Sequence, residues 1–248
     1  MDETPVYGAS TVKRDPGRDM VEQTAKDAKS EHIEKMGKEL GAQFSQLWQE
    51  LAYLYANWNE YVALFGTKPE RIKLLNDASP SFFRMVQDEL WSVTLLHIAK
   101  LTDLPITGGQ KNLTLRNFSH LIQDEGFKKT VAAKIDAVIA GSKFAKQWRN
   151  KHIAHLDLKL ALEDETAEQL ESASRAQVND ALALIVDVMN TVATHYGVAP
   201  TAFKEATRRN GAISLIYLMN EGLRAREKQL ERLEKGEPIE DDFAARDL

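Results

Sequence analysis

Several features that would point to particular classes of protein are missing from this sequence of 248 residues. It contains no cysteine, which excludes disulfide bridges, thiolate zinc sites and a cysteine nucleophile. A chain without cysteine suits a reducing compartment, so we expect a cytoplasmic protein. No apolar run approaches the ~20 residues of a membrane span, and the acidic first residues have no apolar signal core. We therefore expect neither membrane insertion nor a secretion signal.

The charge is low overall but unevenly distributed. A formal net charge of −5 argues against a general nucleic-acid coat protein, which would be basic. Residues 127–151, however, are rich in lysine and contain a single acid, Asp136, whereas residues 163–171 contain acids and no base. This asymmetry predicts a local basic surface that could meet a polyanion.

The periodicity of apolar residues predicts helices throughout. Apolar side chains recur at steps of three and four, and no convincing strand pattern is present. We expect an all-α bundle of long helices with short connections. The expected helices are 19–65, 70–76, 79–102, 114–124, 126–140, 142–156, 175–196 and 200–235. The expected organisation is a flexible arm (1–18), a helical domain (19–200), a helical extension (201–236) and a disordered tail (237–248).

The most informative segment is residues 148–157, Trp-Arg-Asn-Lys-His-Ile-Ala-His-Leu-Asp. On a helix that advances about 100° per residue, Arg149, His152 and His155 share an arc with the large apolar residues Phe144, Trp148 and Leu156. Polar groups on a buried arc must be hydrogen-bonded or paired with a charge, or they lower stability. The arc therefore predicts either a functional site or a buried polar network. The opposite side of the helix carries Lys143, Lys146, Gln147, Asn150 and Lys151.

Histidine and arginine in one segment suit phosphoryl chemistry. Histidine exchanges a proton near neutral pH, and the guanidinium fork of arginine matches phosphate oxygens. In RNA cleavage by the neighbouring 2′-hydroxyl, His155 would move a proton and Arg149 would stabilise the charged phosphate, with no metal. A two-fold dimer would supply the second histidine. The alternative is a structural pair in which Arg149 is bound to a carboxylate such as Asp157.

These residues resemble a known superfamily. Arg149 to His155 is similar to the R-x(4–6)-H motif of the HEPN superfamily (higher eukaryote and prokaryote nucleotide-binding domains). Three further segments resemble, in order, its abortive-infection branch. They are residues 54–65 (LYANWNEYVALF), residues 90–103, which start Leu-Trp and end Thr-Asp, and residues 112–115 (NLTL). The resemblance covers roughly residues 45 to 195.

The resemblance implies an all-α bundle that dimerises through the motif helices and, in active members, a metal-independent endoribonuclease of toxin–antitoxin or anti-phage systems. It implies that Arg149 and His155 are the catalytic pair, and Asn150 matches the polar residue that often follows the arginine. Some members carry a tyrosine two residues after the histidine that a partner nucleotidyltransferase modifies. Asp157 occupies that position here, so this mode of regulation is not expected.

Other residues are expected to support the pair. Lys146 and Lys151, with Lys143, could steer RNA to the site, and His152 would pack or hydrogen-bond beside the pair. A metal shared by His152 and His155 is disfavoured because no further ligand stands at a telling spacing. We therefore expect no cofactor, a homodimer acting on RNA, and an antitoxin or defence partner.

Two rival hypotheses remain open. The protein could be a non-catalytic module that binds a nucleotide, RNA or a partner protein in the dimer cleft. It could also be a purely structural dimer in which Arg149 and His155 belong to a buried hydrogen-bond network.

Overall fold

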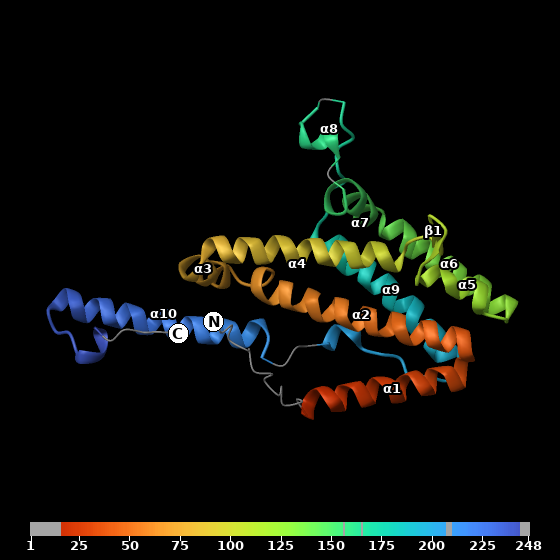
Figure 1. Ribbon diagram of the computed structural model, residues 1–248, viewed down its shortest axis with the longest axis horizontal. Coiled ribbons are helices and arrows are strands. Elements are labelled where there is room, and N and C mark those ends of the chain that lie inside the picture. The colour runs from red at the N-terminus through yellow and green to blue at the C-terminus, as the bar shows by residue number, and fades with distance from the viewer. Residues whose placement is uncertain (1–15, 156, 165, 207–209, 244–248) are drawn as a thin grey trace, which may run out of the picture.

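The computed structural model describes residues 16–155, 157–164, 166–206 and 210–243. The predicted all-α class is confirmed, because helices form nearly all of the regular structure (Figure 1). The helices are α1 (Pro16–Met36), α2 (Lys38–Phe65), α3 (Pro69–Ala78), α4 (Pro80–Leu101), α5 (Phe118–Leu121), α6 (Glu125–Gly141), α7 (Lys143–Trp148), α8 (Leu158–Ala161), α9 (Arg175–His195) and α10 (Ala212–Lys235). None of the described helices has the length and hydropathy that a membrane span requires.

The core forms around α2, which lies between α1 and α4 (Figure 1). Residues at helical spacing along α2 are fully buried, and they meet buried residues of α4, α6 and α9. Each large apolar side chain removed from water contributes about 1.5–3 kcal/mol, so this face of α2 holds the bundle together. The most deeply buried residues include Phe44, Leu47, Leu51, Leu54, Leu95, Ile98, Leu182 and Ile185.

The predicted helix over residues 19–65 is wrong in one respect, because it is two helices. Gly37 has φ 84°, a left-handed conformation that glycine adopts without a steric penalty, and the chain turns there. A Cβ atom at Gly41 would lie 2.3 Å from the carbonyl oxygen of His32. Glycine at both positions therefore lets α1 fold back closely on α2.

Two short strands, β1 (Ile106–Thr107) and β2 (Gln110–Lys111), form an antiparallel hairpin after α4. The sequence predicts a loop here. Gly108 and Gly109 have φ of 55° and 80°, the positive angles that a tight type I′ hairpin turn needs at both central residues. The hairpin fixes the course of the chain between α4 and the short helical turn at Leu115–Asn117.

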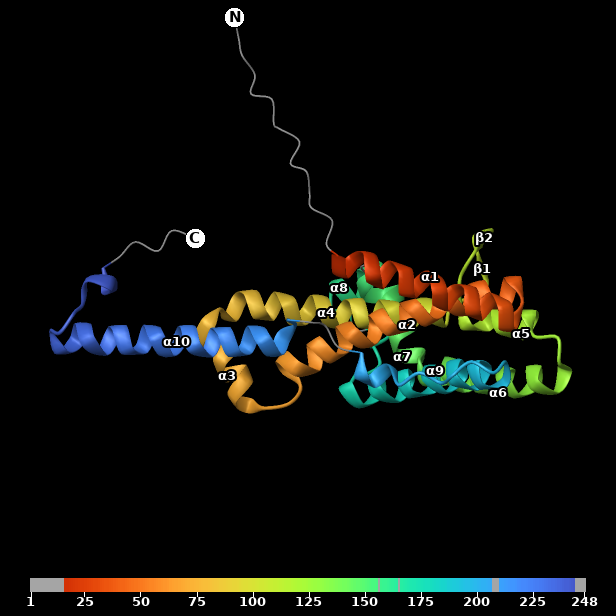
Figure 2. The ribbon, with the colours of Figure 1, turned by 90° about the horizontal axis from the view of Figure 1, so that it is seen from below.

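The prediction of a last helix from residue 200 is also wrong. A 3₁₀ turn forms at Phe203–Glu205, and α10 begins at Ala212, whose backbone N–H donates to the Glu60 carboxylate. The carboxylate thus satisfies one of the unpaired donors at the start of the helix. In both views α10 runs beyond the end of the bundle (Figures 1 and 2).

The two ends of the chain differ from the expected organisation. The expected arm over residues 1–18 overlaps α1, which begins at Pro16, and the rest of it lies outside the described residues. The expected disordered tail contains a 3₁₀ turn at Glu240–Asp242. Arg232 forms an ion pair with Asp242, and Gln229 Nε2 donates to the Asp242 carbonyl oxygen at 2.7 Å. Residues 237–243 are therefore tied to α10.

Candidate functional site

The motif segment does not continue as an α-helix. After α7 the chain forms a π-helical turn, Arg149–Ile153, in which Ala154 N–H donates to the Arg149 carbonyl oxygen at 2.8 Å. π turns are rare and occur often at functional sites. His155 lies beyond the last helical residue, and Leu156 lies outside the described residues. The expected helix to residue 156 is therefore wrong. The expected arc that groups Arg149, His152 and His155 with the large apolar residues is wrong for the same reason.

Burial separates the residues that the arc would have grouped. Phe144 is buried and Trp148 and Arg149 are half-buried, whereas His152 and His155 are exposed. An α-helical wheel overstates the burial of His155 because the turn is wider than an α turn and the helix ends before residue 155.

Asp103 is the partner of Arg149. The Arg149 Nη2 atom lies 3.1 Å from both Asp103 Oδ1 and Asp103 Oδ2. The side chains are 23% and 17% exposed, so water screens the pair less than an ion pair on the surface. Arg149 Nε is buried and has no hydrogen-bond partner among the described residues. The guanidinium is thus held through Nη2 alone.

Asp157, the carboxylate suggested for Arg149 by the structural alternative, has another role. Its side chain accepts hydrogen bonds from the backbone N–H groups of Lys159 at 3.0 Å and Leu160 at 3.1 Å. Asp157 is therefore the N-cap of α8, and the prediction that it pairs with Arg149 is wrong.

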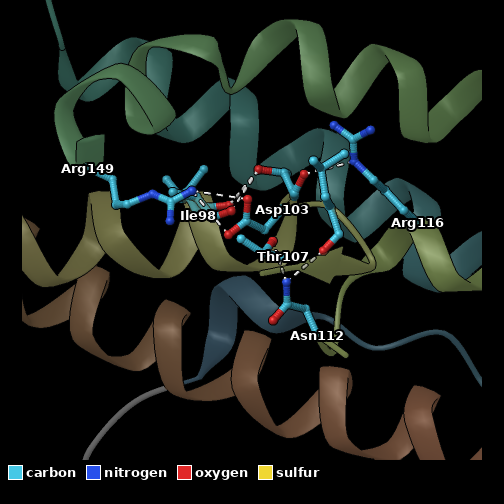
Figure 3. A network of polar contacts seen from close by, with 9 residues as sticks. Ile98, Asp103, Thr107, Asn112, Arg116 and Arg149 are labelled. Atoms are coloured by element: carbon cyan, nitrogen blue, oxygen red, sulfur yellow. Dashed lines mark hydrogen bonds and ion pairs between the residues drawn. The ribbon is translucent and has the colours of Figure 1, made fainter. Parts of the chain in front are cut away.

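The residues on either side of Asp103 are fixed by further hydrogen bonds (Figure 3). The Thr102 carbonyl oxygen accepts from Arg116 Nε at 3.0 Å. The Leu104 carbonyl oxygen accepts from Asn112 Nδ2 at 2.8 Å. This network orients the Asp103 carboxylate toward Arg149, so the end of α4, the hairpin and the π turn meet at one place.

The acidic segment lies against the motif. Glu168 Oε2 lies 2.5 Å from Lys151 Nζ, and Glu171 N–H donates to Gln147 Oε1 at 2.6 Å. Trp148 Nε1 donates to the Glu171 carbonyl oxygen at 2.9 Å. The hydrogen bond from Lys151 holds the pKa of Glu168 below its ordinary value. Lys151, expected to steer RNA, therefore already has a carboxylate partner.

The remaining expected residues have distinct surroundings. The rings of Trp148 and His152 meet edge to face with centroids 5.5 Å apart, which agrees with the packing role expected of His152. Asn150 and Lys143 are exposed, and Lys146 is half-buried. The described residues contain no group of three or more His, Cys, Asp or Glu that could hold a metal ion.

A comparison with known protein families gives a match over most of the chain. A family model described as AbiU2, of the HEPN class, matches residues 37–215. The chain belongs to the HEPN AbiU2 family. No curated protein and no solved structure gives a match. This match confirms the abortive-infection branch suggested by the resemblance. The matched region contains Arg149, His155, Asp103 and the acidic segment.

Reasoning from the sequence missed two residues of this site, Asp103 and Glu168. Asp103 lies at the end of a segment that resembles the family, but sequence spacing gives no indication that it reaches Arg149, 46 positions later. Glu168 belongs to a run of acids, and the run alone does not indicate which carboxylate contacts Lys151.

Proposed function

We propose that this protein is a metal-independent endoribonuclease that works as a homodimer in the cytoplasm, in phage defence or as a toxin. The supporting observation is the guanidinium of Arg149, which Asp103 fixes beside an exposed segment that ends at His155. Membership of the HEPN AbiU2 family supports the defence context. An antitoxin or another defence protein is the expected partner.

Arg149 binds the scissile phosphate. Both Asp103 oxygens contact Nη2. The Nη1 side of the guanidinium has no hydrogen-bond partner among the described residues. A phosphate oxygen that accepts from Nη1 gains a charge-assisted hydrogen bond. The attraction strengthens as negative charge builds on the phosphate in the transition state.

His155 transfers protons. Its exposed position lets it reach a 2′-hydroxyl or a leaving 5′-oxygen, and an imidazole can both give and take a proton. One histidine cannot act as base and acid in the same step. A two-fold dimer that brings two π turns together supplies the second histidine. Asn150 and His152, also exposed on this turn, would line the interface.

The test is an RNA cleavage assay with EDTA present. We expect the native protein to leave 2′,3′-cyclic phosphate ends, and Arg149→Ala and His155→Ala to reduce the rate by about 100-fold or more. Arg84→Ala and His195→Ala are matched controls, because Arg84 pairs with Asp88 on α4 and His195 stacks on Phe127. Both controls should keep the native rate.

Full activity in His155→Ala would refute the assignment of the histidine. Complete absence of cleavage by the native dimer would favour the second candidate, a HEPN module that binds a nucleotide, RNA or a partner protein without cleaving it. One observation supports that candidate, namely that Arg149 already has a carboxylate partner in the unliganded chain.

A further inference from the structure

A cavity separate from the motif lies between the first turns of α2, the hairpin and α5. Its volume is about 430 Å³, within the range of small-molecule sites. Its wall includes Asn112, whose side chain holds the Leu104 carbonyl oxygen next to Asp103. The cavity thus shares a segment with the Arg149 network but contains neither Arg149 nor His155.

Three carboxamide side chains line the cavity, and hydrogen bonds fix their orientation. Asn117 Nδ2 donates to the Asn112 carbonyl oxygen at 2.9 Å and to Gln43 Oε1 at 2.8 Å. Asn112 Nδ2 donates to the Leu104 carbonyl oxygen and to Thr107 Oγ1. Because a carbonyl oxygen only accepts, the amide nitrogens of Asn112 and Asn117 must point at these oxygens.

These bonds leave a defined set of unused polar atoms. Among the described residues, Asn112 Oδ1, Asn117 Oδ1 and Gln43 Nε2 have no hydrogen-bond partner. These three atoms belong to residues that line the cavity, so a ligand there could use two acceptors and one donor, all neutral. A nucleobase with an exocyclic amine beside a ring nitrogen, such as adenine, presents the complementary donors and acceptor, and Asn and Gln commonly bind adenine through this edge.

The rest of the lining fits a nucleotide. Pro105, Leu113 and Leu121 give apolar surface for the face of a base. Lys111 and His120, both exposed at the rim, can bind a phosphate. Glu39, also exposed at the rim, can accept from a ribose hydroxyl.

We propose that this cavity binds an amino-bearing nucleobase of the adenine type, carried by a free nucleotide or by a nucleotide in an RNA strand. The base inserts among the three carboxamides and the phosphate stays at the rim near Lys111. The proposal does not rest on nuclease activity, because binding at this cavity requires neither Arg149 nor His155.

The probes are AMP, IMP and a short oligoadenylate RNA, with binding followed by calorimetry and by chemical shifts of the Asn and Gln side-chain amides. IMP has an oxygen in place of the exocyclic amine, so it should bind about tenfold more weakly than AMP. The RNA arm uses His155→Ala, so that the proposed cleavage cannot consume the ligand. Tight binding of AMP indicates a free nucleotide as ligand, and binding of the oligoadenylate alone indicates a base of an RNA strand.

Two variants locate the site. Gln43→Leu removes the donor and Lys111→Ala removes the rim cation, and each should weaken binding by about tenfold. Their matched controls are Gln46→Leu, an exposed residue of the same helix, and Lys129→Ala on α6, which should bind as the native protein does. If Gln43→Leu does not fold, the affinity of Lys111→Ala and the ratio of the AMP and IMP affinities of the native protein test the proposal. Equal affinity for AMP and IMP, no binding of either AMP or the oligoadenylate, or unchanged affinity in Lys111→Ala would overturn the proposal.

Discussion

The two expected catalytic residues, six positions apart, lie in very different surroundings. Arg149 is half-buried, bound by both oxygens of Asp103 and surrounded by a network from α4 and the hairpin. His155 is exposed and follows the end of the helical structure. One chain therefore builds the phosphate-binding half of the proposed site by itself. The proton-transfer half would be completed by the second copy of the proposed dimer.

This contrast separates the effects of substitution on stability from those on activity. A residue within a half-buried polar network affects the folded state when it is removed, because its partner loses a hydrogen bond. An exposed residue has little effect on folding. The predictions below use this difference, from the largest expected effect to the smallest.

Asp103→Ala should lower both stability and activity. It leaves the Arg149 guanidinium half-buried without a counter-charge, which we expect to cost roughly 1–3 kcal/mol of unfolding free energy. Loss of the fixed geometry should reduce the RNA cleavage rate by up to about 100-fold. Urea unfolding and the EDTA cleavage assay measure the two effects. His155→Ala is the counterpart, with native stability and lost cleavage, and equal stability loss in both variants would refute the contrast.

Acid pH should destabilise the fold through two histidines outside the motif. Burial lowers the pKa of His32 and of His97, so the folded chain favours their neutral forms. Their contribution to stability is complete above the unfolded pKa of about 6.5, and it is lost as the pH falls through their lower folded pKa values. His32 is 5% exposed and meets Phe44 edge to face.

His32→Phe should therefore reduce the fall in Tm between neutral pH and pH 5, since phenylalanine suits the apolar site and takes up no proton. His155→Ala, which alters an exposed histidine, should keep the native pH dependence. A pH dependence of Tm that disappears in His155→Ala and persists in His32→Phe would show that the motif, rather than α1, controls acid stability.

Glu168→Gln should have the smallest effect. It weakens the contact with Lys151, so amide hydrogen exchange across residues 166–171 should become faster and RNA affinity should rise by no more than about fivefold, with Tm unchanged. Glu171→Gln is the matched control, because Glu171 contacts α7 through its backbone atoms. Identical exchange rates in the two variants would mean that the Glu168 side chain does not hold this segment in place.

The sequence predicts the helical class, the helix from residue 79 that corresponds to α4 and the position of α9, because apolar periodicity is a local signal. It does not predict the break at Gly37 or the start of α10 at Ala212. The break depends on a close approach between helices, and α10 begins where Glu60, 152 positions away, caps it.

For the site, the sequence identifies the segment but not its geometry. Arg149 is recognisable from the motif, and its ion pair depends on the tertiary position of Asp103. The position of His155 depends on a change of helical type, which leaves no recognisable mark in the apolar pattern. Asp157 carries the negative charge expected of a partner for Arg149, but its side chain caps the N-terminus of α8.

The π turn at Arg149–Ile153 also bears on how this motif tolerates insertions and deletions. A hydrogen bond from Ala154 to Arg149 spans one residue more than an α-helical bond. Removing a residue from such a turn can restore α-helical bonding without shifting Arg149. The residues that follow the turn, including the exposed His155, would shift instead. The spacer between the arginine and the histidine can thus vary in length while the arginine stays anchored, as the variable R-x(4–6)-H pattern requires.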